Sequence, residues 1–165
     1  MDTLMLHGKW QFRCTQDPLW HSATVPGSVL NDLLQNGMTE DPFYRENEYA
    51  ARDLFENDYE YQFDFEADAT LLQHERLTLV CEGLDTLATV TLNGQVILQA
   101  DNMHRTWEAD VKPHLRKGRN HIHVLFSSPL RFIREHYAAI PDNFVSTGCM
   151  PGNEHLRKAH YMFGW

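Results

Sequence analysis

The feature that most constrains the fold is a strict alternation of side-chain types over residues 59–66. Aromatic residues occupy every second position, namely Tyr59, Tyr61, Phe63 and Phe65, and acids and an amide stand between them. Successive side chains of a β-strand point to opposite faces, so this segment presents one apolar and one polar face. A strand of this kind fits an antiparallel sheet with one face on a core and the other in water.

Three further segments alternate in the same way. Their period of two predicts half-buried strands rather than helices, whose apolar residues recur every three or four positions. Short strands separated by turn residues, with few helical segments, are typical of an antiparallel sandwich. The segments are residues 9–13, residues 77–81 (Leu77, Leu79 and Cys81 inward) and residues 121–126 (Ile122, Val124 and Phe126 inward).

Asn93 and Gly94 lie between two β-rich runs, residues 88–92 and 95–98. A two-residue hairpin turn of the favoured type requires positive φ at both central positions, and Asn followed by Gly adopts it readily. The pair therefore predicts a tight antiparallel hairpin.

Two short helices are expected beside the strands. Ser28 can cap a helix with an apolar stripe within residues 29–34, and Gly37 follows as a stop. A second helix is expected over residues 130–139, because Pro129 suits a helix start. The predicted fold class is all-β: an antiparallel jelly-roll β-sandwich with one or two short helices.

The sandwich is expected to occupy residues 1–140. Residues 141–165 are interpreted as a loop and aromatic tail leading toward a following domain. The loop is rich in Pro, Gly, Asn and Ser, and the chain then ends in Tyr-Met-Phe-Gly-Trp. Aromatic side chains at a chain end need a surface to pack on, either this sandwich or a segment that comes after it.

Charge and cysteine content exclude several function classes. The 165 residues carry a formal net charge of −9, whereas nucleic-acid binding needs clustered Lys and Arg. No apolar signal core opens the sequence and no run approaches the length of a membrane span. Cys14, Cys81 and Cys149 are widely spaced and form no C-x-x-C motif, which favours free thiols and a cytoplasmic location.

No motif for a nucleophile, a nucleotide or a metal-dependent hydrolase occurs in the sequence, so no cofactor and no metal are expected. His121 and His123 share one face of a strand, but no third ligand is suitably spaced, and surface positions explain the pair better. The carboxylates of residues 46–58 are interpreted as a solvated acidic loop, with substrate contact as the alternative and acid–base catalysis not favoured.

Residues 41–48 combine aromatic, basic, amide and acidic side chains in one long loop. Loops on a rigid sandwich often carry binding residues. Asn groups can donate and accept hydrogen bonds to sugar hydroxyls, and aromatic rings stack on sugar faces. The alternative is a structural loop whose aromatic side chains cap the core.

Taken in chain order, the motifs resemble the N-terminal domain of glycoside hydrolase family 2, in its β-mannosidase branch. The resemblance spans essentially the whole chain, and its last motif is the most specific. The motifs are Leu6–Phe12, Val25–Val29 with Asp32–Leu34, Asp41–Glu48, Glu82–Val90 with Leu92–Gly94, Asp101–Arg105 and Arg157–Trp165.

This resemblance implies a galactose-binding-like jelly roll that forms the first domain of a larger exo-acting enzyme. Such an enzyme hydrolyses terminal β-D-mannose residues, and its two catalytic glutamates lie in a later (β/α)8 barrel. The chain is therefore expected to stop before the catalytic domain, to hold no catalytic residue and to be inactive alone. The implied partners are a β-mannoside or manno-oligosaccharide and the following domains of the same chain, with no nucleic acid and no membrane.

The resemblance also implies which side chains face the sugar. Trp165 matches the Trp of a Trp-Asp pair that contacts the terminal sugar, and Asn47 matches the Asn of the acidic loop motif. Tyr44 and Glu46 are further candidates. Two alternative functions stay open: a stand-alone carbohydrate-binding module, and a purely structural domain whose aromatic tail is a docking surface.

Overall fold

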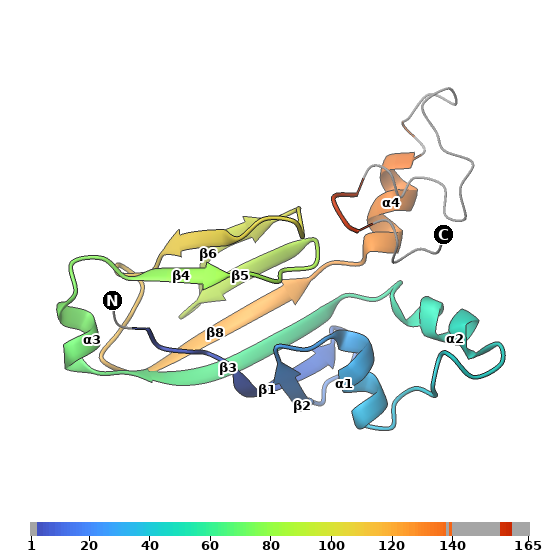
Figure 1. The fold of residues 1–165 in the computed structure, drawn as a ribbon, viewed down its shortest axis with the longest axis horizontal. Coiled ribbons are helices and arrows are strands. Elements are labelled where there is room, and N and C mark those ends of the chain that lie inside the picture. Colours follow the sequence, from blue (N-terminus) through green and yellow to red (C-terminus); the bar gives the residue numbers. More distant parts are fainter. Residues whose placement is uncertain (1–2, 138, 140–155, 160–165) are drawn as a thin grey trace.

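The computed structural model describes residues 3–137, 139 and 156–159. Eight strands and four short helices occur in this part of the chain (Figure 1). In chain order they are β1 (Gly8–Cys14), β2 (His21–Val25), α1 (Val29–Gln35), α2 (Asn47–Leu54), β3 (Tyr59–Ala67), α3 (Ala69–Gln73), β4 (Thr78–Cys81), β5 (Ala88–Leu92), β6 (Gln95–Ala100), β7 (Trp107–Asp110), β8 (Gly118–Phe126) and α4 (Pro129–Tyr137).

Six strands form one sheet in the order β2-β1-β3-β8-β5-β6, and β4 pairs with β7 in a second sheet. Every strand pair is antiparallel. The longest pair, β3 with β8, runs from Tyr59 opposite Phe126 to Ala67 opposite Gly118. This arrangement confirms the antiparallel sandwich that the alternation predicts.

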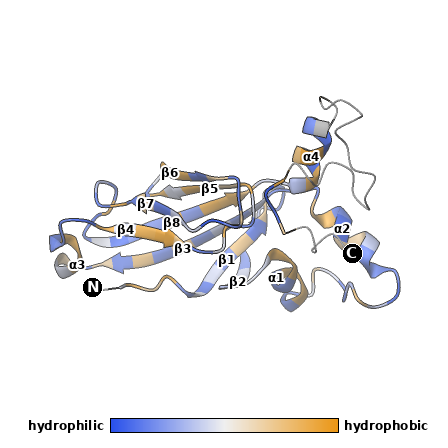
Figure 2. Ribbon diagram, turned by 45° about the horizontal axis from the view of Figure 1, so that its top comes forward, coloured by the Kyte–Doolittle hydropathy of each residue, from blue (hydrophilic) through white to orange (hydrophobic). Residues whose placement is uncertain are grey.

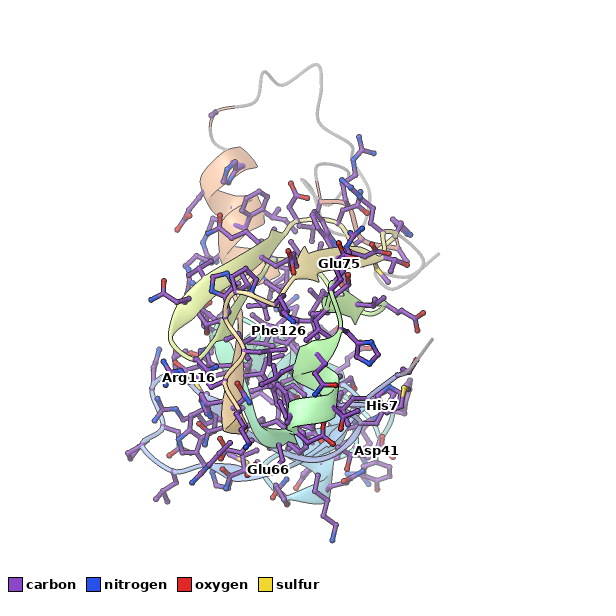
Figure 3. All side chains as sticks on the ribbon, turned by 90° about the vertical axis from the view of Figure 1, so that its left-hand side faces the viewer. His7, Asp41, Glu66, Glu75, Arg116 and Phe126 are labelled. Atoms are coloured by element: carbon purple, nitrogen blue, oxygen red, sulfur yellow. The ribbon has the colours of Figure 1, made fainter. Side chains whose placement is uncertain are left out.

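The core lies between the two sheets, where the alternating apolar residues meet. Figure 2 shows apolar and polar residues following one another along the strands. Phe12 and Val90 are fully buried, and Tyr59 and Tyr61 are nearly so. Figure 3 looks along the sandwich, and Phe126, which is partly buried against the core, is labelled near the middle of this view. The expected inward sets of β3, β4 and β8 all pack on this core.

The predicted hairpin joins β5 to β6, and its turn has φ values of 52° at Asn93 and 84° at Gly94. The Asn93 side chain also links three segments. Its Nδ2 donates to the carbonyl of His114 and to Oδ1 of Asn120, both at 2.8 Å, and its Oδ1 accepts from the amide of His121. Asn93 therefore fixes the turn against the start of β8 as well as supplying the positive φ.

Both expected helices are present. The Ser28 side chain accepts a hydrogen bond from the amide of Asn31 at the start of α1, and Gly37 follows the helix with a φ of 66°. Helix α4 begins at Pro129.

Two further helices, α2 and α3, occur where the alternation and turn composition indicated no helix. Helix α2 covers Asn47–Leu54, within the segment interpreted as an acidic loop. Its sequence includes Glu48, two alanines and Arg52, which have good helix propensity, and one of these alanines, Ala51, is buried. Helix α3 is one short turn capped by Asp68, whose side chain accepts from the amide of Leu71.

Helices α2, α3 and α4 lie at the two ends of the sandwich, whereas α1 lies beside β2. Figures 1 and 2 both show α2 and α4 at one end, and α3 at the other. The end with α2 and α4 therefore brings residues 41–58 near residues 128–137.

Candidate functional site

The loop at residues 41–47 is closed by its own polar groups. Oδ1 of Asp41 accepts from the amide of Phe43 at 2.9 Å, and the carbonyl of Asp41 accepts from Nδ2 of Asn47 at 2.9 Å. Arg45 turns the chain with a φ of 54°, a left-handed value that few non-glycine residues adopt. Asn47 thus uses its amide nitrogen to hold the loop, and no donor of the described residues reaches its Oδ1.

The aromatic side chains of this loop face solvent. Phe43 is 94% exposed, Tyr44 58% and Tyr49, on α2, 55%. The Arg45 guanidinium lies 5.1 Å from the centre of the Tyr44 ring. These rings do not cap the core, so the alternative of a structural capping loop does not describe them. Exposed aromatic rings of this kind can contact a sugar or another domain.

The acidic residues of the same segment have different environments. Asp58 accepts from both the Arg131 guanidinium and the Ser128 amide, at 2.5 and 2.7 Å respectively. Glu56 pairs with Arg134, and the hydrogen bond from that guanidinium lowers the pKa of Glu56. These two carboxylates fasten α4 to the segment before β3, which the interpretation as a solvated loop missed. Glu46, in contrast, lies exposed just before α2.

A buried carboxylate holds helix α1 in place. Asp32 on α1 is 1% exposed, and it accepts from the amide of Thr24 at 3.0 Å and from the hydroxyl of Tyr61 at 2.7 Å. Burial and this hydrogen bond raise the pKa of Tyr61. Asp32 therefore locks α1 onto β2 and β3, a role that only the three-dimensional contacts reveal.

Residues 156–159 pack against the sandwich. Leu156 and Ala159 are buried, and the carbonyl of Arg157 accepts from the amide of Met103 at 3.0 Å. Lys158 forms an ion pair with Asp85, on the segment between β4 and β5. This part of the expected tail is thus attached to the sandwich.

Of the four predicted site residues, Tyr44 and Glu46 lie exposed on the loop, and the half-buried Asn47 follows them as the first residue of α2. Trp165 lies outside the described residues, as do residues 140–155, so the predicted Trp165 contact and the boundary at residue 140 stay predictions. Tyr49, two positions after Asn47 on α2, is a further exposed aromatic residue, and the sequence offered only its aromatic character as a signal.

The two strand histidines have protein partners. Nδ1 of His121 lies 2.9 Å from Oδ1 of Asp64, and Nε2 of His123 lies 3.5 Å from Oε2 of Glu60. The residues that the structure describes contain no group of three potential ligands able to hold a metal ion. His121 and His123 therefore belong to a polar outer face formed by β3 and β8.

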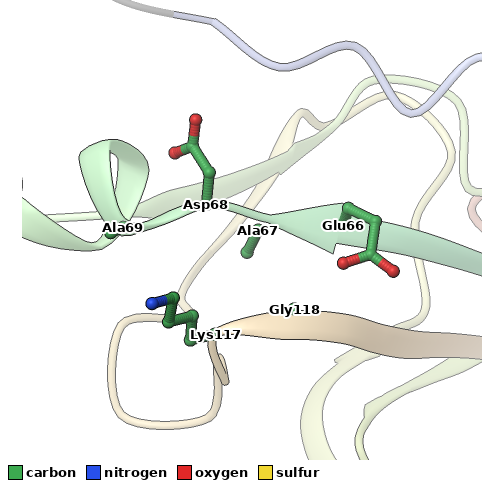
Figure 4. A pocket seen from close by; sticks show the side chains of 6 residues that line it. All are labelled: Glu66, Ala67, Asp68, Ala69, Lys117 and Gly118. Carbon is green, nitrogen blue, oxygen red and sulfur yellow. The ribbon is translucent and has the colours of Figure 1, made fainter.

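A surface hollow at the opposite end of the sandwich has different chemistry. It lies where β3 leads into α3 and is lined by Glu66, Ala67, Asp68, Ala69, Lys117 and Gly118 (Figure 4). None of its lining residues is aromatic, so it lacks a ring on which a sugar could stack.

Among the described helices, none is long and apolar enough to span a bilayer.

The sequence profile of the family described as "Glycosyl hydrolase 2 galactose-binding domain-like" matches residues 10–165. The chain belongs to this family. The β-mannosidase of Bos taurus is 31% identical over 170 residues and is matched by 99% of this chain. The β-mannosidase B of Emericella nidulans is 35% identical over 162 residues and is matched by 94%. Family membership confirms the predicted resemblance.

A solved structure of Dictyoglomus thermophilum β-D-mannosidase matches 100% of this galactose-binding-like chain, with a TM-score of 0.95 and 36% identity. The Amycolatopsis orientalis exo-chitosanase matches 73% of it with a TM-score of 0.62 and 20% identity, which shows the fold alone. The domain spans only 19% of the Bos taurus relative and 20% of the Dictyoglomus chain. Its relatives are therefore multidomain proteins in which such a domain is one part.

Proposed function

We propose that this galactose-binding-like domain is a non-catalytic, sugar-facing part of an exo-acting β-mannosidase that hydrolyses terminal β-D-mannose residues. One observation carries the proposal: the Dictyoglomus β-D-mannosidase matches the whole chain at a TM-score of 0.95, whereas the exo-chitosanase matches 73% of it at 0.62. The curated relatives from Bos taurus and Emericella nidulans, both named β-mannosidases, support the same assignment.

In this proposal the chemistry takes place in a later domain. Hydrolysis of a glycoside needs two carboxyl groups held across the scissile bond. Asp58 and Glu56 form ion pairs with arginines, while Glu46 and Glu48 lie exposed on a surface loop and helix. The catalytic glutamates are instead expected in a following (β/α)8 barrel.

The domain's own contribution is to line the rim of that active site. Asn47 offers an Oδ1 acceptor to which no described residue donates, on a loop that its Nδ2 holds closed, so the acceptor is pre-oriented for a sugar hydroxyl. Tyr44 offers an exposed ring and a hydroxyl beside it, and Glu46 offers a carboxylate. Trp165 is proposed as the stacking contact to the terminal sugar, supplied from the end of the last motif.

The test compares the full-length protein with residues 1–165 alone, using a nitrophenyl β-D-mannoside. We expect turnover by the full-length protein and none by the isolated chain, with circular dichroism showing that the isolated chain is folded. Turnover by the folded isolated chain would contradict the assignment of catalysis to a later domain.

A stand-alone carbohydrate-binding module is the second candidate, and the exposed rings of Phe43, Tyr44 and Tyr49 favour it. Titration calorimetry of the isolated chain against mannose and manno-oligosaccharides separates the two. Dissociation constants below roughly 1 mM support a module. Absence of binding supports a subsite that the following domain must complete.

We further propose a cytoplasmic location. The thiols of Cys14 and Cys81 are free, and burial raises the pKa of Cys81 to about 11, which keeps it protonated and unreactive. Fractionation of the source cells followed by immunodetection tests this location.

A further inference from the structure

The chain contains two Asn-Gly pairs, Asn36-Gly37 and Asn93-Gly94. This dipeptide is chemically labile, because glycine has no side chain to shield its own amide nitrogen from the preceding asparagine. That nitrogen can attack Cγ of the asparagine, a reaction that contributes to the thermal lability of Asn in proteins. At both pairs, the folded structure around the asparagine therefore decides how fast a covalent change occurs.

At Asn93 the fold holds the leaving group of this reaction. Nδ2 of Asn93 donates to the carbonyl of His114 and to Oδ1 of Asn120, both at 2.8 Å. Oδ1 of Asn93 accepts from the amide of His121 at 3.0 Å. Any movement of Cγ toward the amide nitrogen of Gly94, and any departure of Nδ2, must first break these hydrogen bonds.

Asn120 makes this arrangement rigid. It is 1% exposed, and its Oδ1 accepts from the amide of Arg116 as well as from Asn93. Its Nδ2 donates to the carbonyls of Arg116 and Gly118, both at 2.8 Å. Both donors of the amide group are thus used, and its oxygen has two partners. A flip of this amide would place donor against donor, so Asn120 presents only an acceptor to residue 93.

We propose that Asn93-Gly94 is a spontaneous deamidation site that the folded turn keeps intact, and that deamidation permanently detaches the β5–β6 turn from β8. In the reaction the amide nitrogen of Gly94 bonds to Cγ of Asn93, and the bond from Cγ to Nδ2 breaks. Nδ2 leaves as ammonia with the proton of the Gly94 amide, and a succinimide ring remains. Water then opens the ring at either carbonyl, so asparagine and water become ammonia and aspartate or isoaspartate.

The product carboxylate does not match its surroundings. It has only acceptor oxygens, and the position of Nδ2 faces two further acceptors, the carbonyl of His114 and Oδ1 of Asn120. Two hydrogen bonds are lost and buried acceptors are left unsatisfied, which costs more than the hydrogen bonds alone. Isoaspartate also lengthens the backbone of a two-residue turn by one carbon. Either product therefore weakens the attachment of the turn to the start of β8.

Asn36 offers a comparison within the same molecule. Its Nδ2 also donates to two oxygens, the carbonyls of Ser22 and Asp32, at 2.9 and 2.7 Å. Asn36 caps the end of α1, a helix of seven residues, and helix ends fray. None of these partners is shared with Asn93. We therefore expect Asn36 to react faster than Asn93 in the native protein, and to respond independently of changes around Asn93.

The first experiment measures deamidation in the full-length protein, in native buffer and in urea that unfolds it. Samples kept at mildly alkaline pH are digested, and mass spectrometry quantifies aspartate and isoaspartate at residues 93 and 36 over time. A reaction that requires local opening proceeds in proportion to the open fraction, so Asn93 should react at least about tenfold more slowly in the native protein. Equal rates, or no reaction of Asn93 in urea, would overturn the proposal.

The second experiment removes the side-chain acceptor. In Asn120→Ala the native rate at Asn93 should rise at least about fivefold, which corresponds to the net loss of one hydrogen bond. Asn36 in the same molecules is the control, and its rate should stay within about twofold. An unchanged rate at Asn93, or an equal rise at Asn36, would overturn the protective role of Asn120. If this variant does not fold, the comparison of native and unfolded parent protein still decides whether the turn protects Asn93.

The third experiment tests the consequence of deamidation. Asn93→Asp places the product carboxylate in the turn, and Asn93→Gly is the matched control, because glycine keeps the positive φ without any side chain. We expect Asn93→Asp to unfold at a lower urea concentration than Asn93→Gly. A midpoint of Asn93→Asp at or above that of Asn93→Gly would overturn the inferred detachment of the turn.

Discussion

The Arg131 guanidinium donates to both carboxylate oxygens of Asp58, with Nη2 lying 2.5 Å from Oδ1 and 2.7 Å from Oδ2. Asp58 also accepts from the amide of Ser128, and the Ser128 hydroxyl donates to the carbonyl of Phe55. Helix α4 is therefore attached, through its first turn, to the segment that leads from α2 into β3.

This attachment predicts that Arg131→Met destabilises the protein by about 1–3 kcal/mol, because a half-buried carboxylate loses its charged donor. Urea unfolding followed by far-ultraviolet circular dichroism measures the change. Arg134→Met is the matched control, since its pair with Glu56 is more exposed and a surface pair contributes about 0–1 kcal/mol. A larger loss in the control than in Arg131→Met would contradict the assignment.

The same substitution, Phe to Ala, should have different effects on stability at Phe12 and at Phe43. Phe12 is 0% exposed at the centre of the core, and Phe43 is 94% exposed on the loop. We expect Phe12→Ala to cost about 3–5 kcal/mol through lost burial and a cavity, and Phe43→Ala to stay within about 0.5 kcal/mol. Thermal and urea unfolding of both variants measure the difference, and a large loss in Phe43→Ala would mean that its ring is not free.

The stability of the fold should fall in acid. Hydrogen bonding to Arg134 lowers the pKa of Glu56 below its ordinary 4.5, and hydrogen bonding to Arg119 lowers the pKa of Asp64 below 3.8. A carboxylate with a lowered folded-state pKa stabilises the native state above its unfolded pKa, and this contribution is lost as the pH falls through the folded value. Unfolding free energy should therefore decline below about pH 4.5.

Removing the arginine partner tests this explanation. In Arg134→Met the pKa of Glu56 should return toward its ordinary value, so the decline below pH 4.5 should be shallower than in the parent protein. Urea unfolding from pH 3 to pH 7 in steps of about half a unit gives the slope. If the unfolding free energy of both proteins falls equally steeply below pH 4.5, Glu56 does not contribute to the loss of stability in acid.

Much of the sandwich could be predicted from the sequence because its signals are local. The alternation around Phe65 and the turn at Asn93 and Gly94 reflect side-chain direction and backbone preference, which neighbouring residues determine. Helix α2 was missed because its short amphipathic pattern lies within an acidic, loop-like composition, and its stability depends on Ala51 packing against the fold.

The supporting contacts of the site could not be predicted in the same way. Asp58 and Arg131 are 73 positions apart, as are Asp85 and Lys158, and no spacing rule connects residues at such distances. The candidate site residues were identified through the family resemblance. That resemblance indicates Asn47, but it does not indicate that Nδ2 of Asn47 closes the loop by donating to the carbonyl of Asp41.

The Asn47 geometry predicts a substrate effect in the full-length protein. Asn47→Ala removes both the loop-closing donor and the Oδ1 acceptor proposed for the sugar, so kcat/KM for a nitrophenyl β-D-mannoside should fall at least tenfold, a loss of about 1.4 kcal/mol. Asn31→Ala is the control, because that exposed side chain on α1 makes no hydrogen bond to the described residues. An unchanged kcat/KM in Asn47→Ala would remove Asn47 from the proposed rim.

The most direct test of the account is the sugar preference of the full-length protein that carries this domain. Values of kcat/KM for the nitrophenyl β-D-mannoside, β-D-glucuronide and β-D-glucosaminide compare the proposed substrate with two other β-glycosides. We predict that the mannoside is preferred by at least about 100-fold, or about 2.7 kcal/mol. Preference for either other sugar, or no turnover of the mannoside, would contradict the account.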